Sequence, residues 1–314
     1  MGIITEIGWC DSSVNPVVGC DGCELHRIGC AESHCYAASL VGRYKGFPGW
    51  PSSFDAPTQF AGRLDKAYKW ADLTGTERAD KPWLNGYPRL IFVCDLADPF
   101  TESVDPESWL TPALPKMADT PHAYMLLTKR GRRMLEFFQR HPIPRNVWPG
   151  VTVTGPETER RLDYLLRVPG ASVRFVSMEP LLGGVDLQYY TWGDPFDVTH
   201  DLEDAPDGST IGRFERVGMS WEPVLPKLDW VILGGESGAG ARAMNPEWAR
   251  SVRDACERSE TPFFFKQWGE FYPMTRTDGI HESPFGGHAM IPTPKKKAGR
   301  VLDGREWSGM PLWK

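Results

Sequence analysis

The sequence lacks several features that would assign it to a broad class. It has no run of about 18 consecutive apolar residues, so we expect no membrane-spanning segment and no membrane partner. The N-terminal stretch MGIITEIGWCDSS has no basic segment followed by an apolar one, so we expect a cytoplasmic protein without a signal peptide. The net charge of −6 argues against a protein that coats nucleic acid, although a local basic groove is compatible with it.

The common nucleotide-binding loops are also missing. The segment GGESGAGAR (234–242) follows an apolar run, but it is not G-x-G-x-x-G and lacks the Lys and Ser or Thr of a phosphate-binding loop. Its glycines allow a ligand to approach the backbone, and Glu236 offers a carboxylate to an amino or ribose hydroxyl group. A tight turn between a strand and a helix explains the same glycines equally well.

Cysteine is scarce beyond the N-terminal region. Cys94 and Cys256 lie in apolar contexts, where we expect small buried side chains. The other five of the seven cysteines are Cys10, Cys20, Cys23, Cys30 and Cys35, and the last four form C-x2-C-x6-C-x4-C. Thiolates this close in sequence repel one another, so a cation or disulfides must compensate. In a reducing compartment such cysteines are more often ligands or catalysts than disulfides.

Two kinds of metal site match this cysteine pattern. Four ligands make a tetrahedral zinc site, whereas three thiolates hold a [4Fe–4S] cluster with one iron left open. His26 and His34 are able to replace a cysteine in either site, but we expect both in solvated loop positions. A helix is predicted near 36–44, directly after the last cysteine. The cysteines should therefore lie at the mouth of the strands predicted below.

Short apolar runs followed by polar residues or glycine recur along the chain and predict buried parallel strands. They are 90–98, 123–130, 146–155, 173–180, 228–238 and 261–269. Helical patterns lie between several of them, at 132–140, 156–168 and 246–259, the last with Asn245 as N-cap and Pro246 at its first position. This alternation is typical of βαβ units, which build either a doubly wound sheet or a full or partial β/α barrel.

Polar side chains follow every predicted strand, where α/β proteins collect their chemistry. They are Asp95 and Asp98, Lys129 and Arg130, Thr152 and Thr154, Glu179, the turn Gly234, Gly235, Glu236 and Ser237, and Lys266, Gln267 and Trp268. Glu179 is able to bind a cofactor or move a proton, or else to pair with a strand neighbour such as Lys129. The basic run 129–133 suits an anionic group such as phosphate, or a solvated helix start.

Taken together, several segments resemble one family, the phage- and prophage-associated radical S-adenosylmethionine-like proteins with a three-cysteine motif. The matching stretches are NPVVGC (15–20), GC…CYA (29–37), LLTKR (126–130), NVWPGVTV (146–153), RFVSMEPLLG (174–183), DWVILGGESGAGAR (229–242), PFFFKQWGE (262–270) and KKAGRVLDGREW (296–307). The resemblance implies an α/β fold with a partial (β/α)6-type TIM-like barrel of parallel strands. We expect one domain over 1–314, with a cluster-binding segment at 1–40, insertions at 41–89 (containing a helix at 58–71) and 188–226, and an extension at 270–314.

The resemblance also implies a [4Fe–4S] cluster on Cys20, Cys30 and Cys35, with Cys23 able to displace one of them. This chain has four residues between the second and third of these cysteines, where the family has two. The second implied cofactor is S-adenosylmethionine, cleaved to a 5′-deoxyadenosyl radical that abstracts hydrogen from a substrate. The expected substrate is a modified nucleobase in phage DNA, with a free nucleotide or a peptide as alternatives, in the host cytoplasm, and the expected partner is a flavodoxin- or ferredoxin-like reductant.

Strand-end position then suggests roles for individual residues. The expected catalytic residues are Glu179, Lys129 and Lys266, and the expected cofactor contacts are Asp95, Asp98, Glu179, Gly234, Gly235, Glu236 and Ser237. Arg130 and Trp268 are further candidates for contact with substrate or with the cofactor carboxylate.

Two hypotheses from other classes remain open at this stage. One is a zinc-stabilised nucleic-acid-binding or scaffold protein without redox chemistry. The other is a metal-dependent nuclease that uses Asp95, Asp98 and Glu179, which leaves the cysteines unexplained.

Overall fold

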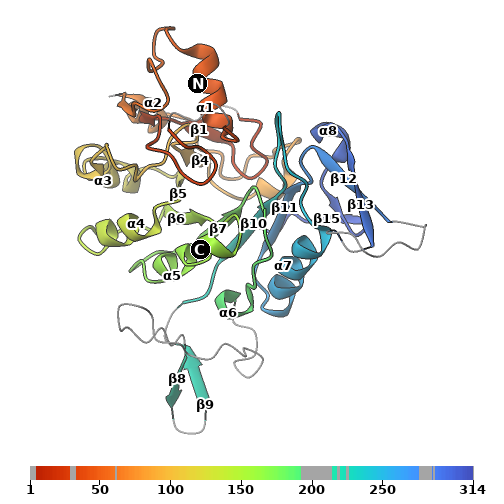
Figure 1. The fold of residues 1–314 in the computed structure, drawn as a ribbon. Helices are drawn as coiled ribbons and strands as arrows, with labels where there is room; N and C mark the ends of the chain where they lie inside the picture. The colour runs from red at the N-terminus through yellow and green to blue at the C-terminus, as the bar shows by residue number, and fades with distance from the viewer. Residues whose placement is uncertain are drawn as a thin grey trace.

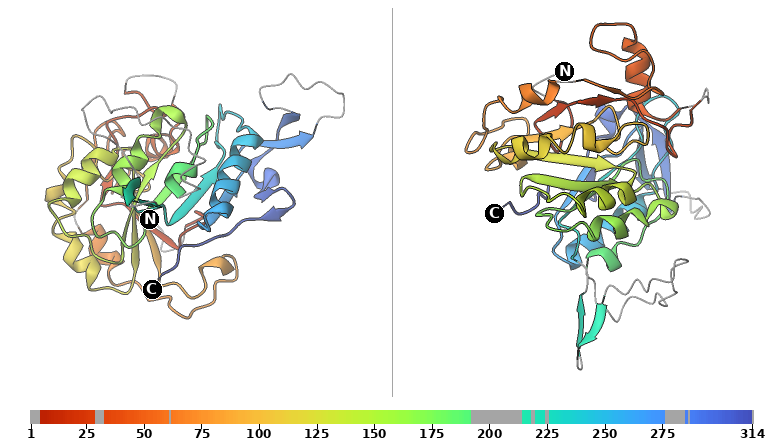
Figure 2. Two further views of the ribbon diagram at one scale, coloured as in Figure 1. Left: turned by 90° about the horizontal axis from the view of Figure 1, so that it is seen from below. Right: turned by 90° about the vertical axis from the view of Figure 1, so that its left-hand side faces the viewer.

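The computed structural model describes residues 5–28, 33–60, 62–191, 214–217, 220–223, 226–275, 285 and 287–313. Within them, a seven-stranded sheet with the order β1-β4-β5-β6-β7-β10-β11 forms the centre of the molecule, and every neighbouring pair is parallel. The strands are β1 (Ser12–Val14), β4 (Leu90–Val93), β5 (Ala123–Thr128), β6 (Val147–Thr152), β7 (Phe175–Met178), β10 (Trp230–Gly234) and β11 (Phe263–Gln267). The sheet curves into an open half-barrel with helices outside it (Figures 1 and 2), which confirms an α/β fold with a partial barrel.

Helices follow most of these strands. They are α1 (Tyr36–Tyr44), α3 (Ala113–Ala118), α4 (Gly131–Phe138), α5 (Arg161–Leu166), α6 (Gln188–Thr191) and α7 (Pro246–Arg258), with α2 (Arg63–Ala67) between β1 and β4. Helices α2 to α7 pack on the outer face, whereas α1 buries Ala37 and Val41 in a separate apolar cluster. Helix α7 begins as predicted, because the Asn245 side chain accepts the Glu247 backbone N–H and Pro246 occupies the first turn. No helix in the described ranges is long and apolar enough to cross a membrane.

Smaller elements decorate this framework. The 3₁₀ turns are η1 (Pro82–Leu84), η2 (Pro106–Ser108) and η3 (Pro156–Thr158). The antiparallel pairs are β2 (Val17–Val18) with β3 (Thr58–Gln59), β8 (Phe214–Val217) with β9 (Ser220–Pro223), β12 (Phe271–Thr275) with β13 (His288–Pro292), and β14 (Val301–Leu302) with β15 (Arg305–Glu306). Helix α8 (Lys295–Ala298) lies between β13 and β14.

Alternate residues of each strand belong to two different apolar cores, as the pleat of a strand requires. On β4, Ile91 and Val93 pack with the helices outside, whereas Leu90 and Phe92 join the core inside the curve of the sheet. The inner core continues round the sheet through Ala123, Met125, Trp148, Phe175, Trp230, Ile232 and Phe264, and Trp9 packs among them. Both faces of the sheet are therefore buried, which explains why its strands are continuous apolar runs.

Side-chain size decreases along the inner face. The bulky rings of Trp148, Phe175 and Trp230 stand at or next to the first residue of their strands, and all three are fully buried. The C-terminal segment seals this end, because Trp313 packs on Trp148 with ring centroids 5.4 Å apart and Gly309 O accepts the Trp230 Nε1–H at 2.8 Å. Further along the same strands, the inner positions are small or polar. The interior is therefore filled at one end and able to open at the other.

The six predicted strands are all present, but one further strand was not predicted and one predicted helix was wrong. Strand β1 was not predicted, because it is only three residues long and carries two serines. The helix expected at 58–71 is reduced to five residues, since Thr58 and Gln59 pair with β2 instead of beginning a helix. In the insertion at 188–226, α6 and the β8–β9 hairpin are described, and residues 192–213 lie outside the described part of the chain.

Replacing Gly150 tests the packing of the inner core. A Cβ atom at Gly150 would lie 2.5 Å from the ring of Phe175, so Gly150→Ala should lower the free energy of unfolding by about 1–3 kcal/mol. In helix α1, a Cβ on Gly42 meets nothing within 4 Å, and Gly42→Ala should be neutral or slightly stabilising. Urea unfolding measures both, and equal stability of the two variants would contradict this packing.

Candidate functional site

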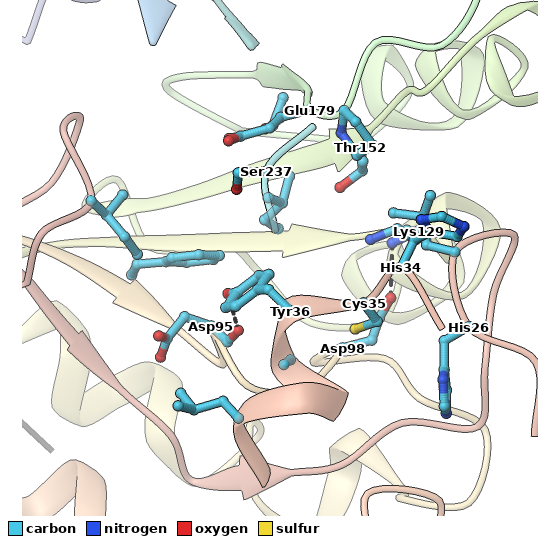
Figure 3. A pocket seen from close by; sticks show the side chains of 18 of the residues that line it. His26, His34, Cys35, Tyr36, Asp95, Asp98, Lys129, Thr152, Glu179 and Ser237 are labelled. Carbon is cyan, nitrogen blue, oxygen red and sulfur yellow. Dashed lines mark hydrogen bonds between the residues drawn. The ribbon is translucent and has the colours of Figure 1, made fainter. Parts of the chain in front are cut away.

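A cavity of about 520 Å³ opens at the C-terminal ends of the inner strands (Figure 3). The alternation that fills the core continues into it, because Leu127 and Lys129 follow Met125 on the same face of β5, and Ser177 and Glu179 follow Phe175 on β7. Thr152 from β6 and Lys266 from β11 complete this polar ring. The cavity is therefore the unfilled half of the barrel interior.

Three of the N-terminal cysteines line this same cavity. They are Cys20, Cys23 and Cys35. The remaining cysteine of the C-x2-C-x6-C-x4-C motif, Cys30, lies outside the described residues. Burial raises the pKa of each of the three thiols. Besides burial, the charge of a Cys20 thiolate would raise the pKa of Cys35, and the charge of a Cys35 thiolate would raise that of Cys23. Among described residues no three Cys, His, Asp or Glu side chains are already arranged to hold a metal ion.

Polar contacts fix the loop that carries these cysteines. The carboxylate of Asp21 accepts the Thr101 hydroxyl at 2.6 Å, and that of Glu24 accepts two N–H groups of Arg161 at 2.9 Å. The imidazole of His26 contacts Ser33 Oγ at 2.8 Å and Asp55 Oδ1 at 2.6 Å. His26 is buried, so its expected solvated position was wrong, and its ring organises the loop.

Two cations at the end of β5 adjoin the cysteines. Arg130 Nη1 lies 3.6 Å from Cys20 Sγ and 3.0 Å from Asp98 Oδ2, and its Nη2 donates to Gly22 O at 3.0 Å. Lys129 lines the cavity, where its charge lowers the pKa of Cys23 and Cys35 against the larger effect of burial. Both residues adjoin the thiols, and their positive charges favour an anionic group there.

A family model described as "Protein of unknown function (DUF5131)" matches residues 4–311 of this chain. This chain belongs to that family. No curated protein and no solved structure matches it.

Glu179 and Lys266 form an ion pair across the cavity wall. Lys266 Nζ lies 2.7 and 2.8 Å from the two carboxylate oxygens of Glu179, and Gln267 Nε2 donates to the same carboxylate at 3.1 Å. The partner of Glu179 is thus Lys266, not Lys129. The amide oxygen of Gln267 is buried without a hydrogen-bond partner in the described structure, and Gln267 itself is not among the residues that line the cavity.

The two aspartates after β4 occupy different environments. Asp98 lines the cavity, yet its carboxylate is engaged by Arg130, by the Thr128 hydroxyl at 2.5 Å and by the Lys129 backbone N–H at 2.8 Å. Asp98 therefore positions the two cations. Burial raises the pKa of Asp95, an effect that hydrogen bonds from Asn15 and Ser13 only partly offset. Burial therefore favours the protonated form of the Asp95 carboxyl group.

Packing accounts for one of the two glycines of the 234–237 turn, Gly235. A Cβ on Gly235 would lie 2.0 Å from the backbone oxygen of Trp268, and one on Gly234 would lie 3.4 Å from Glu179 Cδ. Glu236 is buried and paired with Arg242 at 2.7 Å, while His34 Nδ1 lies 3.6 Å away. Gly235, Glu236 and Ser237 line the cavity. The turn thus brings polar groups to the rim, and packing against Trp268 requires glycine at position 235.

Trp268 and most of the basic run 129–133 do not line the cavity. Trp268 is buried in the outer core and donates its Nε1–H to Val301 O at 2.7 Å, so it serves packing. In the basic run, Arg133 donates to Phe100 O and Thr101 O, and Arg132 pairs with Glu136. The run is therefore mostly tied to protein acceptors, and Lys129 is the member that reaches the cavity.

Sequence reasoning missed several cavity residues. Tyr36 donates its hydroxyl to the backbone oxygen of Asp95 and lines the wall beside Cys35 (Figure 3). Trp9, Phe54 and Phe92 add aromatic surface, and Lys295 stands at the rim. The position of Tyr36 directly after Cys35 was a usable signal, whereas Trp9 and Phe54 carry no pattern that marks them.

A double-mutant cycle tests the ion pair of the cavity wall. Lys266→Met and Glu179→Gln should each destabilise the protein, with a coupling free energy of about 0.5–3 kcal/mol between them. The exposed pair Arg132–Glu136 provides the control, for which a coupling below about 0.5 kcal/mol is expected. Additive effects of the first pair in urea unfolding would contradict the contact.

The salt bridge of Glu24 predicts a pH dependence. Burial alone raises the pKa of Glu24, but hydrogen bonds and charge from Arg161 outweigh it and lower this pKa from 4.5 to about 2. Stability from this contact is complete above pH 4.5 and is lost as the pH falls toward about 2, because the unfolded chain binds the proton more tightly. Glu24→Gln should remove this part of the acid sensitivity, whereas replacing the exposed Glu77 by Gln should not. Urea unfolding between pH 7 and pH 3 measures the free energy of unfolding of the wild type and both variants. If this free energy falls with pH equally in the wild type and in Glu24→Gln, the salt bridge does not contribute to the acid sensitivity.

Proposed function

We propose that this protein is a radical S-adenosylmethionine enzyme that holds a [4Fe–4S] cluster through Cys20, Cys35 and a third thiol, either Cys30 or Cys23. The observation that carries the proposal is that Cys20, Cys23 and Cys35 line one cavity together with the polar strand ends. Thiolates are the ligands that iron–sulfur clusters use, and three of them leave one iron free to bind a ligand.

The surroundings of the thiols fit such a group. A cluster with its thiolates is anionic, and Arg130 and Lys129 supply positive charge beside it. Cys35 directly precedes helix α1, whose first backbone N–H groups also favour negative charge. When bound, the reduced cluster supplies the electron that cleaves S-adenosylmethionine to a 5′-deoxyadenosyl radical, which then abstracts hydrogen from the substrate.

The residues of the chain have separate tasks in this proposal. Lys129, which lines the cavity, binds a carboxylate near the thiols. Glu179 and Lys266 hold a proton between their facing atoms, 2.7 Å apart, and are able to move it to or from a bound ligand. Asp95, Glu236 and Ser237 bind polar groups at the rim, and the aromatic wall excludes water.

We also infer that the half-barrel is of the six-unit TIM-like kind. Strands β1, β4, β5, β6, β7 and β10 are followed by α1, α3, α4, α5, α6 and α7, and β11 adds a seventh strand. The proposed substrate is a nucleobase, in phage DNA or as a nucleotide, and the proposed electron donor is a flavodoxin- or ferredoxin-like protein. The aromatic side chains of Trp9, Tyr36, Phe54 and Phe92 in the cavity support a flat heterocyclic substrate.

Anaerobic reconstitution tests the enzyme class. The wild-type chain should bind about four irons and four sulfides and form 5′-deoxyadenosine when dithionite and S-adenosylmethionine are added. Cys20→Ala and Cys35→Ala should lose both properties. Cys256→Ala, in helix α7 and buried outside the cavity, should keep them. Zinc in place of iron, with no 5′-deoxyadenosine, would overturn the proposal in favour of a zinc-stabilised binding protein.

A further inference from the structure

The end of helix α1 and the loop that follows it carry aromatic and basic side chains in alternation. Residues 43–50 read RYKGFPGW, so Arg43 and Lys45 flank Tyr44, and Phe47 and Trp50 follow. Helix α1 and this loop project beyond the sheet (Figures 1 and 2). The residues lie in the insertion at 41–89, and the proposed chemistry of the cavity does not use them.

The aromatic rings of this loop are presented to solvent. Phe47 is 61% exposed and Tyr44 is 38% exposed. Tyr44 stacks on Trp50 with ring centroids 4.8 Å apart and planes inclined by 24°, and Phe47 meets the edge of Tyr44 at 6.2 Å. Three rings thus form a small continuous platform, where a folded protein would ordinarily bury such side chains.

The loop has a defined shape. Two successive turns close through hydrogen bonds from the Phe47 N–H to Tyr44 O at 3.2 Å and from the Trp50 N–H to Phe47 O at 3.1 Å. Gly46 and Gly49 take the positive φ angles that such turns need, and the guanidinium of Arg63 donates to Gly49 O. The platform is therefore held in place before anything binds, which reduces the entropy lost on binding.

The local charge is positive, although the whole chain is acidic. No Asp or Glu occurs from Ser33 to Phe54, a stretch that contains Arg43 and Lys45. Both are exposed, and neither has an ion-pair partner among the described residues. A ligand with flat aromatic faces and a negative backbone complements this surface in both respects.

Helix α1 connects the platform to the cavity. Tyr36 and Leu40, from its first two turns, line the cavity, and Tyr44 ends the helix. Nine residues of helix span about 13 Å, so the platform lies one short helix away from the cysteines. Lys295, the first of three consecutive exposed lysines, stands at the rim of the same cavity.

We propose that residues 43–50 form a stacking platform for single-stranded nucleic acid, whose bases lie on Phe47 and Tyr44 while Arg43 and Lys45 contact phosphates. The strand is thereby led along α1 toward the cavity. An acidic protein partner would match the charges, but it would not need the exposed rings of Phe47 and Tyr44. This inference rests on the proposed function and specifies its substrate as a polynucleotide strand rather than a free nucleotide.

Fluorescence anisotropy with a labelled single-stranded DNA of about 12 nucleotides tests the platform, since one such binding site spans about 4–16 nucleotides. The full-length protein should bind it, and Phe47→Ala and Tyr44→Ala should each weaken binding about tenfold, as loss of one stacked base requires. Tyr272→Ala, on strand β12, is the matched control, because Tyr272 is 40% exposed and should not matter.

Two further measurements make the test strict. Replacing Arg43 and Lys45 together by Gln should reduce the slope of log K against log salt by about 1.4. An unlabelled duplex of the same sequence should compete more weakly than the single strand. The proposal is overturned if the single strand does not bind, if Tyr272→Ala is as harmful as Phe47→Ala, or if only charge matters.

The binding assay needs no reduced cofactor, so its failure is separable from failure of the enzyme class. Formation of 5′-deoxyadenosine without strand binding would reject the platform alone. Strand binding that depends on Phe47 and Tyr44, without 5′-deoxyadenosine, would support the platform and reject the radical chemistry.

Discussion

The inner face of the half-barrel imposes the constraint on which the site depends. Large rings fill the beginnings of the inner strands, and small or polar residues occupy their ends. Because strand side chains alternate with a period of two, the register that buries Phe175 also directs Ser177 and Glu179 into the cavity. A shift by one residue would turn Ser177 and Glu179 toward the apolar outer core and remove the ring of Phe175 from the inner one. The register of the strands therefore determines both the packing of the core and the geometry of the site.

The cysteine loop is attached to this sheet by charged contacts rather than by a large core. Asp98, after β4, holds Arg130, which follows β5 and lies beside Cys20. Glu24, within the loop, pairs with Arg161 of α5. These contacts connect the thiols to three consecutive strand–helix units. Most of these charged groups are largely removed from water, so each partner needs the other.

The sequence was sufficient for the regular parts of the fold and for most of the site. The six long strands were predictable because burial on both faces leaves continuous apolar runs, and α7 was predictable from its cap. Strand β1 was too short and too polar to recognise. Most strand-end residues do meet in one cavity, as parallel strands require. The contacts of Trp268 and Arg133 could not be predicted, because their partners, Val301 O, Phe100 O and Thr101 O, come from segments that no local pattern connects.

The central claim is that the thiols of Cys20 and Cys35 bind iron inside the cavity. Anomalous diffraction from anaerobically grown crystals of the reconstituted protein, collected at the iron and zinc absorption edges, tests it most directly. The account predicts a strong iron peak bounded by the sulfurs of Cys20 and Cys35, on the side of the cavity that holds Arg130. A zinc peak at that position, or iron bound elsewhere, would contradict it.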